Sequence, residues 1–334
     1  MKTLQTLSYF IAACLLFLLS LGLFCYSLYT VYTGPSRLAE ERIIVIPKGA
    51  SSAAIAEKLA QEKIIRSALA FRLVTAASGQ QASLKAGEYQ FVPYSTLTEV
   101  IRKIETGDVF VQQVTIPEGW TSYRVYETVQ KHNDLQGTLS AVPAEGALLP
   151  QTYRYQTGDT KQSIITRMEN DMAQTLEKLW PARAADLPLA TPQEALVLAS
   201  IVEKETGLKH EERVRVAGVF INRLRKGMKL ETDPTVIYAL TKGREKNAGQ
   251  GPLGRRLLKK DMDIDSPYNT YKYAGLPPGP ICNPGEAAIK ATLNPENHAY
   301  LYFVADGTGG HVFAETFAEH LKNVAKWRNI RARQ

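Results

Sequence analysis

Glu194 to Gly207, EALVLASIVEKETG, is an apolar run that ends on two carboxylates with a lysine between them. The usual signals for a helix start precede it. Thr191 suits an N-cap, Pro192 suits the first helical position, and Glu194 stands three residues after the threonine, as in a capping box. Gly207 is a matching stop. The sequence therefore predicts a helix that carries acidic side chains in its last turn, and we expect the fold to be built around it.

The two carboxylates of this predicted helix lie on different sides of it. With about 100° of rotation per residue, Glu205 falls within about 60° of Leu198 and prolongs the apolar stripe. Glu203 lies about 140° from Leu198 and flanks the stripe. A carboxyl group among aliphatic side chains loses solvation of its charged form, so its pKa rises toward the range in which it donates a proton at neutral pH. This pattern is typical of a general acid, although two surface glutamates would give the same periodicity.

The composition is that of a globular chain. Of its 334 residues, 45% are hydrophobic, which is enough for a sizeable core and for one or two domains. The net charge of +7 is concentrated locally at Lys242 to Lys246 and Arg255 to Lys260. Such clusters are typical of solvated loops and would also suit an anionic surface. Because zinc-finger spacing and an aromatic RNA-binding signature are both missing, we expect no nucleic-acid partner.

The sequence lacks the residue patterns that disulfides, metal sites and serine nucleophiles need. Cys14 and Cys25 lie inside an N-terminal apolar run, so Cys282 has no partner for an intramolecular disulfide in the rest of the chain. The histidines do not have the spacing of zinc sites, and we expect no metal and no cofactor. Ser200 lies in mid-helix without a Gly-x-Ser-x-Gly elbow, which disfavours an esterase-type nucleophile. Carboxylate chemistry is what is left.

The segment from Leu7 to Val31 contains no charged residue. It is longer than the roughly 7–15 residues of a signal-peptide core and long enough for the roughly 20 that a bilayer needs. We therefore predict a transmembrane signal anchor at 7–31, with a tail at 1–6 and a linker at 32–42. The basic residues on its two sides nearly balance, so the positive-inside rule alone leaves the orientation open.

Beyond the linker, the pattern predicts a small strand–helix–helix–strand module at 43–110. Its elements are a strand at Ile43 to Pro47, helices at Ser51 to Gln61 and Ser67 to Ala77, and a returning strand at Gly87 to Val92. An amphipathic helix at Ser95 to Thr106 follows them.

The remainder, 111–334, is expected to be mostly helical with short strands, which makes the fold class α+β. Helices are predicted at Ser122 to Lys131, Ser163 to Trp180, Glu211 to Lys226 and Glu315 to about Arg328, and strands at Val109 to Pro117 and Tyr300 to Ala305. Thr232 or Asp233 caps a further short helix. The loop SPYNTYKYAGLPPGP, Ser266 to Pro280, offers aromatic faces with amide and hydroxyl groups, which suits sugar rings. A proline-rich surface loop stabilised by its own tyrosines has the same composition.

Four ordered motifs carry a family resemblance. They are LASIVEKETG, INRLRKGMKLETDPTVIYAL, SPYNTYKYAGLPPGPICNPG and YLYFVADGTGGHVFAETFAEH, and the upstream TIPEGW at Thr115 to Trp120 fits as well. Together they closely resemble the MltG (YceG-like) family of endolytic murein transglycosylases. The N-terminal anchor and the small module also look like that family's membrane segment and LysM-like subdomain. One departure is Gln151, where the family usually has an aspartate, so a role for that side chain is not carried over.

The resemblance implies a lytic transglycosylase that cleaves the β-1,4 bond between N-acetylmuramic acid and N-acetylglucosamine of peptidoglycan without water. The product has a 1,6-anhydro end, and the implied role is to terminate the elongation of nascent glycan strands. One carboxyl group suffices, first as acid and then as base. Other lytic transglycosylase families carry their catalytic glutamate just before a hydroxyl residue at the end of a similar helix. Glu205-Thr206 reproduces that dipeptide, so we assign the role to Glu205 rather than Glu203.

The implied site has further members and an implied location. Asp233, Thr235, Asn269 and Tyr271 are candidate groups for positioning the glycan. The resemblance also implies a single-pass protein of the cell membrane whose N-terminus is cytoplasmic and whose catalytic body faces the cell wall. Glycan strands are the expected partner, and enzymes of cell-wall synthesis are further candidates.

Two other functions stay open. In a peptidoglycan hydrolase, or muramidase, Asp233 would be the second carboxylate that activates water, at roughly 5–9.5 Å from the first. A non-catalytic wall-binding protein would use only the membrane anchor and the LysM-like module. The glutamate and tyrosine motifs argue against this last function.

Overall fold

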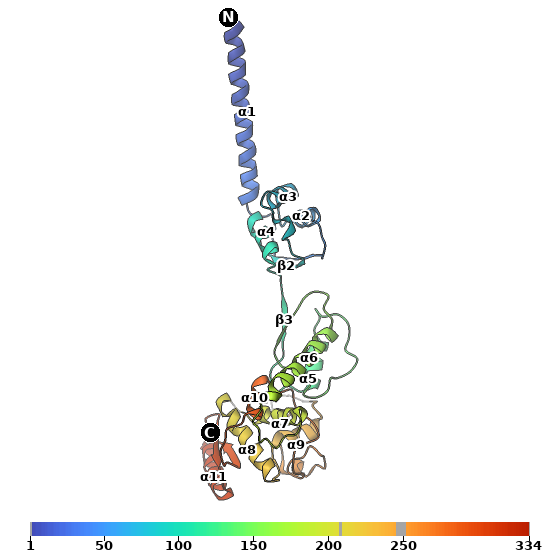
Figure 1. Cartoon of the computed structure of the whole chain (residues 1–334), viewed down its shortest axis with the longest axis vertical. Helices are drawn as coiled ribbons and strands as arrows, with labels where there is room; N and C mark the ends of the chain where they lie inside the picture. Colours follow the sequence, from blue (N-terminus) through green and yellow to red (C-terminus); the bar gives the residue numbers. More distant parts are fainter. Residues whose placement is uncertain (1, 207–208, 245–251, 334) are drawn as a thin grey trace. The chain divides into compact units, whose positions relative to one another are not determined.

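The computed structural model describes residues 2–206, 209–244 and 252–333 (Figure 1). The chain divides into two compact units, Met1–Gln112 and Gln113–Gln334. Helices alternate with three small two-stranded sheets in the described ranges, so the prediction of an α+β fold is confirmed. The LysM-like identity of the first unit and the assigned domain limits stay predictions.

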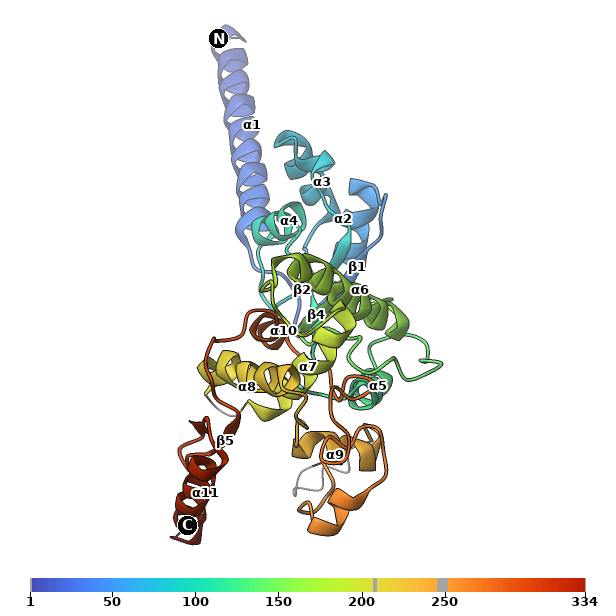
Figure 2. The ribbon, with the colours of Figure 1, turned by 60° about the horizontal axis from the view of Figure 1, so that its bottom comes forward.

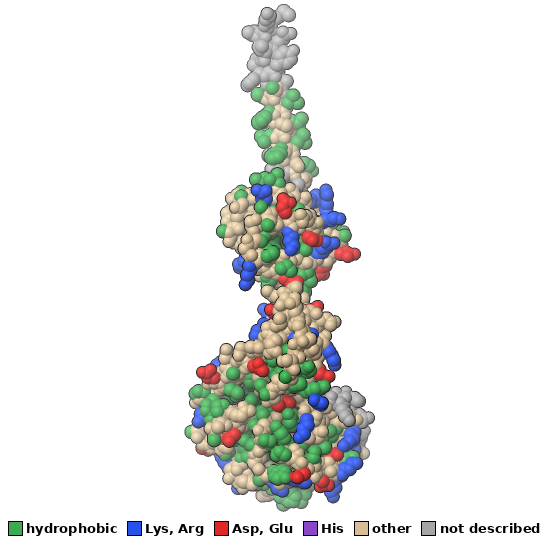
Figure 3. Space-filling view, turned by 90° about the vertical axis from the view of Figure 1, so that its right-hand side faces the viewer, with side chains coloured by type: hydrophobic (Ala, Val, Ile, Leu, Met, Phe, Trp, Pro, Cys, Tyr) green, Lys and Arg blue, Asp and Glu red, His purple; other side chains and the backbone are tan. Residues whose placement is uncertain are grey.

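The chain begins with the long helix α1 (Lys2–Thr33). Large apolar side chains are exposed along it: Leu15, Leu16, Phe17, Leu18, Leu19, Leu21, Leu23, Phe24, Tyr26 and Tyr29 (Figure 3). A search of the described residues finds no helix with both the length and the apolarity of a membrane span. The transmembrane anchor therefore stays a prediction.

The predicted strand–helix–helix–strand order of the first unit is confirmed. Strand β1 (Arg42–Ile46) pairs antiparallel with β2 (Gly87–Phe91), and α2 (Ser52–Gln61) and α3 (Ala68–Ala77) connect them. Helix α4 (Leu97–Thr106) follows and closes the same apolar core. Each helix starts where a serine or threonine side chain accepts a hydrogen bond from a backbone N–H three residues on, which is why the starts were predictable.

The second unit contains two apolar cores. The first core joins β3 (Gln112–Thr115), β4 (Thr152–Tyr155), α5 (Ser122–Gln130) and α6 (Lys161–Leu179). The second core joins α7 (Pro192–Glu205), α8 (Arg213–Arg225) and α10 (Glu286–Leu293) (Figure 2). Helix α9 (Asp233–Thr241), the strands β5 (Tyr302–Ala305) and β6 (His311–Ala314), and helix α11 (Phe317–Arg333) complete it.

Two strands and one α-helix in the described part of this unit were not predicted. Strands β4 and β6 are only four residues long, too short for alternation to stand out. Helix α10 starts at Gly285 without a side-chain cap, so no capping signal marks it. The strand predicted at Val109 to Pro117 was too long, because only Gln112–Thr115 pairs with β4.

Helix α7 is buried on all sides over most of its length. Every residue from Ala195 to Val202 is at most 4% exposed, because α8, α9 and α10 all contact this helix. The predicted one-sided stripe was therefore too narrow. The N-cap is confirmed, since Thr191 accepts from the N–H of Glu194, but the Glu194 carboxylate accepts from Ala190 instead of closing a capping box. Gly207, the predicted stop, lies outside the described residues.

Candidate active site

The C-terminal end of α7 opens into a cavity of about 540 Å³. Its walls come from α7, α8, α9, α11, the β5–β6 hairpin and the tyrosine-rich loop. The polar side chains at one part of the wall are Glu205, Thr232, Asp233, Tyr271 and His311. Two of the aromatic side chains on the wall, Tyr302 and Phe317, are in ring contact with each other. The cavity thus combines a small polar cluster with apolar surface.

Glu205 is the residue through which α7 reaches this cavity. The hydroxyl of Thr232 donates a hydrogen bond to its Oε1. Burial raises the pKa of Glu205, and the negative charge of Asp233 raises it further. The hydrogen bond from Thr232 and the charge of His311 act in the opposite direction. A carboxyl group in this setting keeps its proton at higher pH than an exposed glutamate, which is what a general acid needs.

Asp233 and Tyr271 form a pair at the same wall. The Tyr271 hydroxyl donates to Asp233 Oδ1 at 2.7 Å. Burial, followed by this hydrogen bond and the charge of Asp233, raises the pKa of Tyr271, so the phenol keeps its proton. Tyr271 thereby holds the Asp233 side chain in place at the cavity wall. Two of the four residues predicted to position a glycan therefore do border the cavity.

The other two, Thr235 and Asn269, are not among the residues that line it, and their part in positioning a glycan stays a prediction. Both are 0% exposed. The Thr235 hydroxyl donates to the backbone oxygen of Thr232 at 2.7 Å. Asn269 donates to the backbone oxygens of Met262 and Ile264, and its own side-chain oxygen accepts from the N–H of Tyr271. Their polar groups therefore shape the segments that carry Thr232 and Tyr271.

Glu203 faces away from the cavity and takes part in a buried ion cluster. Its side chain is 7% exposed and lies 3.4 Å from Arg213 Nη2, which is also 3.6 Å from Glu118. The backbone N–H of Gly285 donates to its other oxygen at 3.0 Å. Burial raises the pKa of Glu203 as well. A raised pKa therefore does not distinguish the two glutamates, whereas access to the cavity does.

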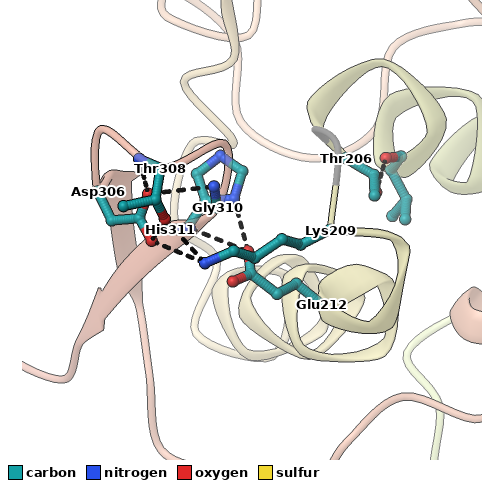
Figure 4. Close-up of polar contacts among 8 residues, drawn as sticks. Thr206, Lys209, Glu212, Asp306, Thr308, Gly310 and His311 are labelled. Atoms are coloured by element: carbon teal, nitrogen blue, oxygen red, sulfur yellow. Dashed lines mark hydrogen bonds and ion pairs between the residues drawn. The ribbon is translucent and has the colours of Figure 1, made fainter.

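Sequence reasoning missed two neighbours of this site, His311 and Glu212. His311 begins β6 and borders the cavity, and its Nδ1 lies 3.0 Å from Glu212 Oε2 (Figure 4). The histidine was considered only for zinc spacing. Its place in the motif GTGGHVF, directly after a glycine-rich turn, is the signal that could have identified it.

Three other residues that the sequence singled out lie elsewhere. The side-chain amide of Gln151 donates to Asp171 Oδ2 at 2.6 Å, and the cavity is not lined by it. Cys282 is buried and its thiol donates to the backbone oxygen of Ser200 at 3.3 Å. In 2–206, 209–244 and 252–333, no group of three or more His, Cys, Asp or Glu side chains is suited to a metal ion.

Several known proteins are similar to this chain. A Bacillus subtilis (strain 168) protein named endolytic murein transglycosylase is 32% identical over 315 residues, covering 85% of this chain and 84% of that protein. Two Streptococcus pneumoniae proteins of the same name, from strains D39 and R6, are 31% identical over 85% of this chain and 58% of their own length. The crystal structure of a YceG-like protein from Listeria monocytogenes matches with 32% identity and a TM-score of 0.50, over 85% of this chain and 98% of that one.

The match to a family model is equally extensive. It runs from residue 44 to residue 326, and so it includes parts of both compact units and every residue that lines the cavity. This chain belongs to the YceG-like family.

Proposed function

We propose that this protein is an endolytic murein transglycosylase, with Glu205 as its acid and base. The observation that carries the proposal is that Glu205 is a desolvated carboxyl group at the wall of a cavity. The relatives that share about a third of its sequence bear the same activity in their names. The bond cleaved is the β-1,4 bond between N-acetylmuramic acid and N-acetylglucosamine of peptidoglycan.

One carboxyl group completes this reaction without water. Glu205 gives its proton to the glycosidic oxygen, the bond from C1 of N-acetylmuramic acid to that oxygen breaks, and N-acetylglucosamine leaves with a hydroxyl group. The C6 hydroxyl oxygen of the same muramic acid then bonds to C1. Its proton passes to the Glu205 carboxylate, which regenerates the acid. The products are a 1,6-anhydro end and a free 4-hydroxyl, and no atom is gained or lost.

The surrounding side chains support both halves of this cycle. Thr232 orients the Glu205 carboxyl group through its hydrogen bond. Tyr271 holds Asp233 in place, and the charge of Asp233 raises the pKa of Glu205 and so favours the protonated form that begins the reaction. Tyr302 and Phe317 offer aromatic faces on which the C–H face of a sugar ring stacks.

We further propose that the segment 7–31 anchors the protein in the cell membrane, with residues 1–6 cytoplasmic and the catalytic unit on the cell-wall side. The support is the row of exposed apolar side chains between Leu15 and Tyr29. Such a surface is costly in water and stable in hydrocarbon. Cleavage within strands near the membrane would terminate the elongation of nascent glycans, and it would bring the protein close to enzymes of wall synthesis.

The test of the activity is product analysis by mass spectrometry after incubation with purified peptidoglycan. The full chain is compared with Glu205→Gln and with the matched variant Glu203→Gln. We expect anhydro-muropeptides from the wild type, none from Glu205→Gln, and the same products from Glu203→Gln at a temperature at which that variant is folded.

Other results would identify another function. Products that are heavier by one water, with reducing ends, would mean hydrolysis and would make Asp233 the second carboxylate. Loss of activity in Glu203→Gln, with activity retained in Glu205→Gln, would move the acid to Glu203. Binding without any product from the wild type would mean a non-catalytic wall-binding protein.

A further inference from the structure

The turn between β5 and β6 is tied to the segment that follows α7. Lys209 Nζ donates to Asp306 Oδ2 at 3.1 Å and to Thr308 Oγ1 at 3.0 Å (Figure 4). Inside the turn, Asp306 Oδ1 accepts from the N–H groups of Thr308 and Gly310, at 2.6 and 3.1 Å. These charge-assisted contacts fix the start of β6 relative to the residues just before α8. The first residue of β6 is His311, at the cavity wall.

Glu212 holds His311 at two points. Its Oε2 accepts from the backbone N–H of His311 at 3.0 Å and lies 3.0 Å from the ring Nδ1. The side chains are only 14% and 12% exposed, so water competes little for this contact. A β-carbon on Gly310 would lie 2.6 Å from Glu212 Oε1, so the glycine is what lets the carboxylate approach so closely.

The ring orientation follows from these contacts. Glu212 is an acceptor, so Nδ1 carries the hydrogen and Nε2 is the nitrogen at the far side of the ring. Phe303 packs edge-on against the imidazole, with ring centroids 5.2 Å apart and planes at 84°. The imidazole is therefore held in one orientation, at the wall of the cavity that Glu205 also borders.

We propose that Glu212 and His311 are a positioning pair whose charge stabilises the carboxylate that Glu205 becomes after it has protonated the leaving group. This inference rests on the proposed function of Glu205. His311 is the neighbour whose charge acts on Glu205, and the carboxylate of Glu212 holds the imidazole in place through the ring Nδ1 and the backbone N–H. Neither residue exchanges a proton with the glycan.

Several polar groups share the cavity with Glu205. Those that interact with its carboxyl group are Thr232 and Asp233 at the start of α9, Tyr271 from the tyrosine-rich loop, and His311 from β6. Arg223 of α8, Glu231 and His320 of α11 line the same cavity. Asp233 favours the protonated form of Glu205, which suits the first step but opposes the carboxylate that is needed next. His311 is the cationic neighbour that opposes Asp233, since its charge lowers the pKa of Glu205. A group that first donates a proton and then accepts one needs a neighbour that favours its protonated form and a neighbour that favours its carboxylate.

The experiment is the pH dependence of kcat/KM for anhydro-muropeptide release by the full chain, in the wild type, His311→Gln and Glu212→Gln. The alkaline limb of this profile reports deprotonation of the acid in the free enzyme. Loss of the positive neighbour raises the pKa of Glu205, so the limb should move to higher pH, by about 0.5–1 unit in His311→Gln and by less in Glu212→Gln. The maximal rate should fall about tenfold, because the carboxylate has lost its stabilising charge.

Glu211→Gln is the matched control. It makes the same charge change at the exposed neighbouring position, which does not border the cavity, and it should keep the wild-type profile. A loss of rate in His311→Gln and Glu212→Gln with an unmoved limb would mean a merely structural role and would overturn the proposal. If His311→Gln fails to fold by circular dichroism, the limb of Glu212→Gln decides alone. Activity retained in Glu205→Gln would instead overturn the proposed function, which separates the two failures.

Discussion

At the scale of single residues, Glu203 and Glu205 show how two identical side chains two positions apart acquire different surroundings. Both are removed from water, and burial raises the pKa of each. The oxygens of Glu203 accept hydrogen bonds from Arg213 and from the backbone N–H of Gly285. Glu205 accepts one from the hydroxyl of Thr232 and borders the cavity. The two carboxyl groups differ in their contacts: those of Glu203 are with protein groups, whereas Glu205 also borders the cavity. A carboxyl group must be accessible to a substrate to transfer a proton to it.

We expect Asp233→Asn to shift the pKa of Glu205 in the opposite direction to His311→Gln. The negative charge of Asp233 raises the pKa of Glu205, so its removal lowers that pKa. Glu205 is then protonated over a narrower range, and the alkaline limb of kcat/KM should move to lower pH by about 0.5–1 unit. The measurement is the pH profile of anhydro-muropeptide release.

Asp265→Asn is the matched control for that change. Asp265 accepts from the Tyr273 hydroxyl at 2.7 Å, the same contact that joins Asp233 to Tyr271, but it does not border the cavity. Its profile should equal that of the wild type. A limb that moves equally in both variants would show that general charge, and not a local neighbour, sets the pKa of Glu205.

At the scale of elements, helix α7 acts as the support of the site because its middle, from Ala195 to Val202, is buried. Ser200 in its middle donates to the backbone oxygen of Val197 at 2.7 Å and accepts from the N–H of Ile281 at 3.0 Å. Through these hydrogen bonds, Ser200 connects the segment after the tyrosine-rich loop to the helix that carries Glu205. The polar atom in an otherwise apolar core is a structural tie.

Ser200→Ala should therefore lower the free energy of unfolding by about 1–3 kcal/mol, because the buried N–H of Ile281 loses its acceptor. The products should stay the same, since Ser200 does not border the cavity. Urea denaturation followed by circular dichroism measures the change. Thr241→Ala, which removes only a hydroxyl bonded back to Ile237 of its own helix, should change it by less than about 0.5 kcal/mol. Equal effects of the two variants would show that the tie to Ile281 has no special weight.

At the scale of the whole molecule, the chain combines a first unit with its own apolar core and a second unit that contains the cavity. The two cores of the second unit come entirely from residues beyond Gln113. The described residues that line the cavity around Glu205 all belong to the second unit. We therefore expect the attachment of the protein and its chemistry to be separable.

Membrane attachment is tested by cell fractionation. The full chain should stay with the membranes after extraction with alkaline carbonate, whereas a chain that starts at residue 34 should be released and should still form Glu205-dependent products. Leu18→Arg combined with Leu19→Arg should also weaken attachment, because each charge near the centre of a span costs about 2.5–3.5 kcal/mol. Release of the unaltered full chain by carbonate would contradict the proposed anchor.

The sequence by itself determined most of the helices, the strand–helix–helix–strand order of the first unit, and the choice of Glu205 as the candidate acid. Helix starts depend on a cap and on side chains within about four residues, and such signals are complete in any short window of sequence. Short strands such as β4 and β6 have no such local signal. Their pairing depends on a partner strand, as the joining of β3 to β4 shows.

Only the tertiary structure decided which side chains face the cavity. It brought Thr232 to Glu205 across 27 positions and Glu212 to His311 across 99, and it buried the side chains of Thr235 and Asn269. The physical reason is that the environment of a side chain depends on which distant segments of the chain pack against it. Periodicity along one helix reports which residues share a face, but it does not report what that face meets.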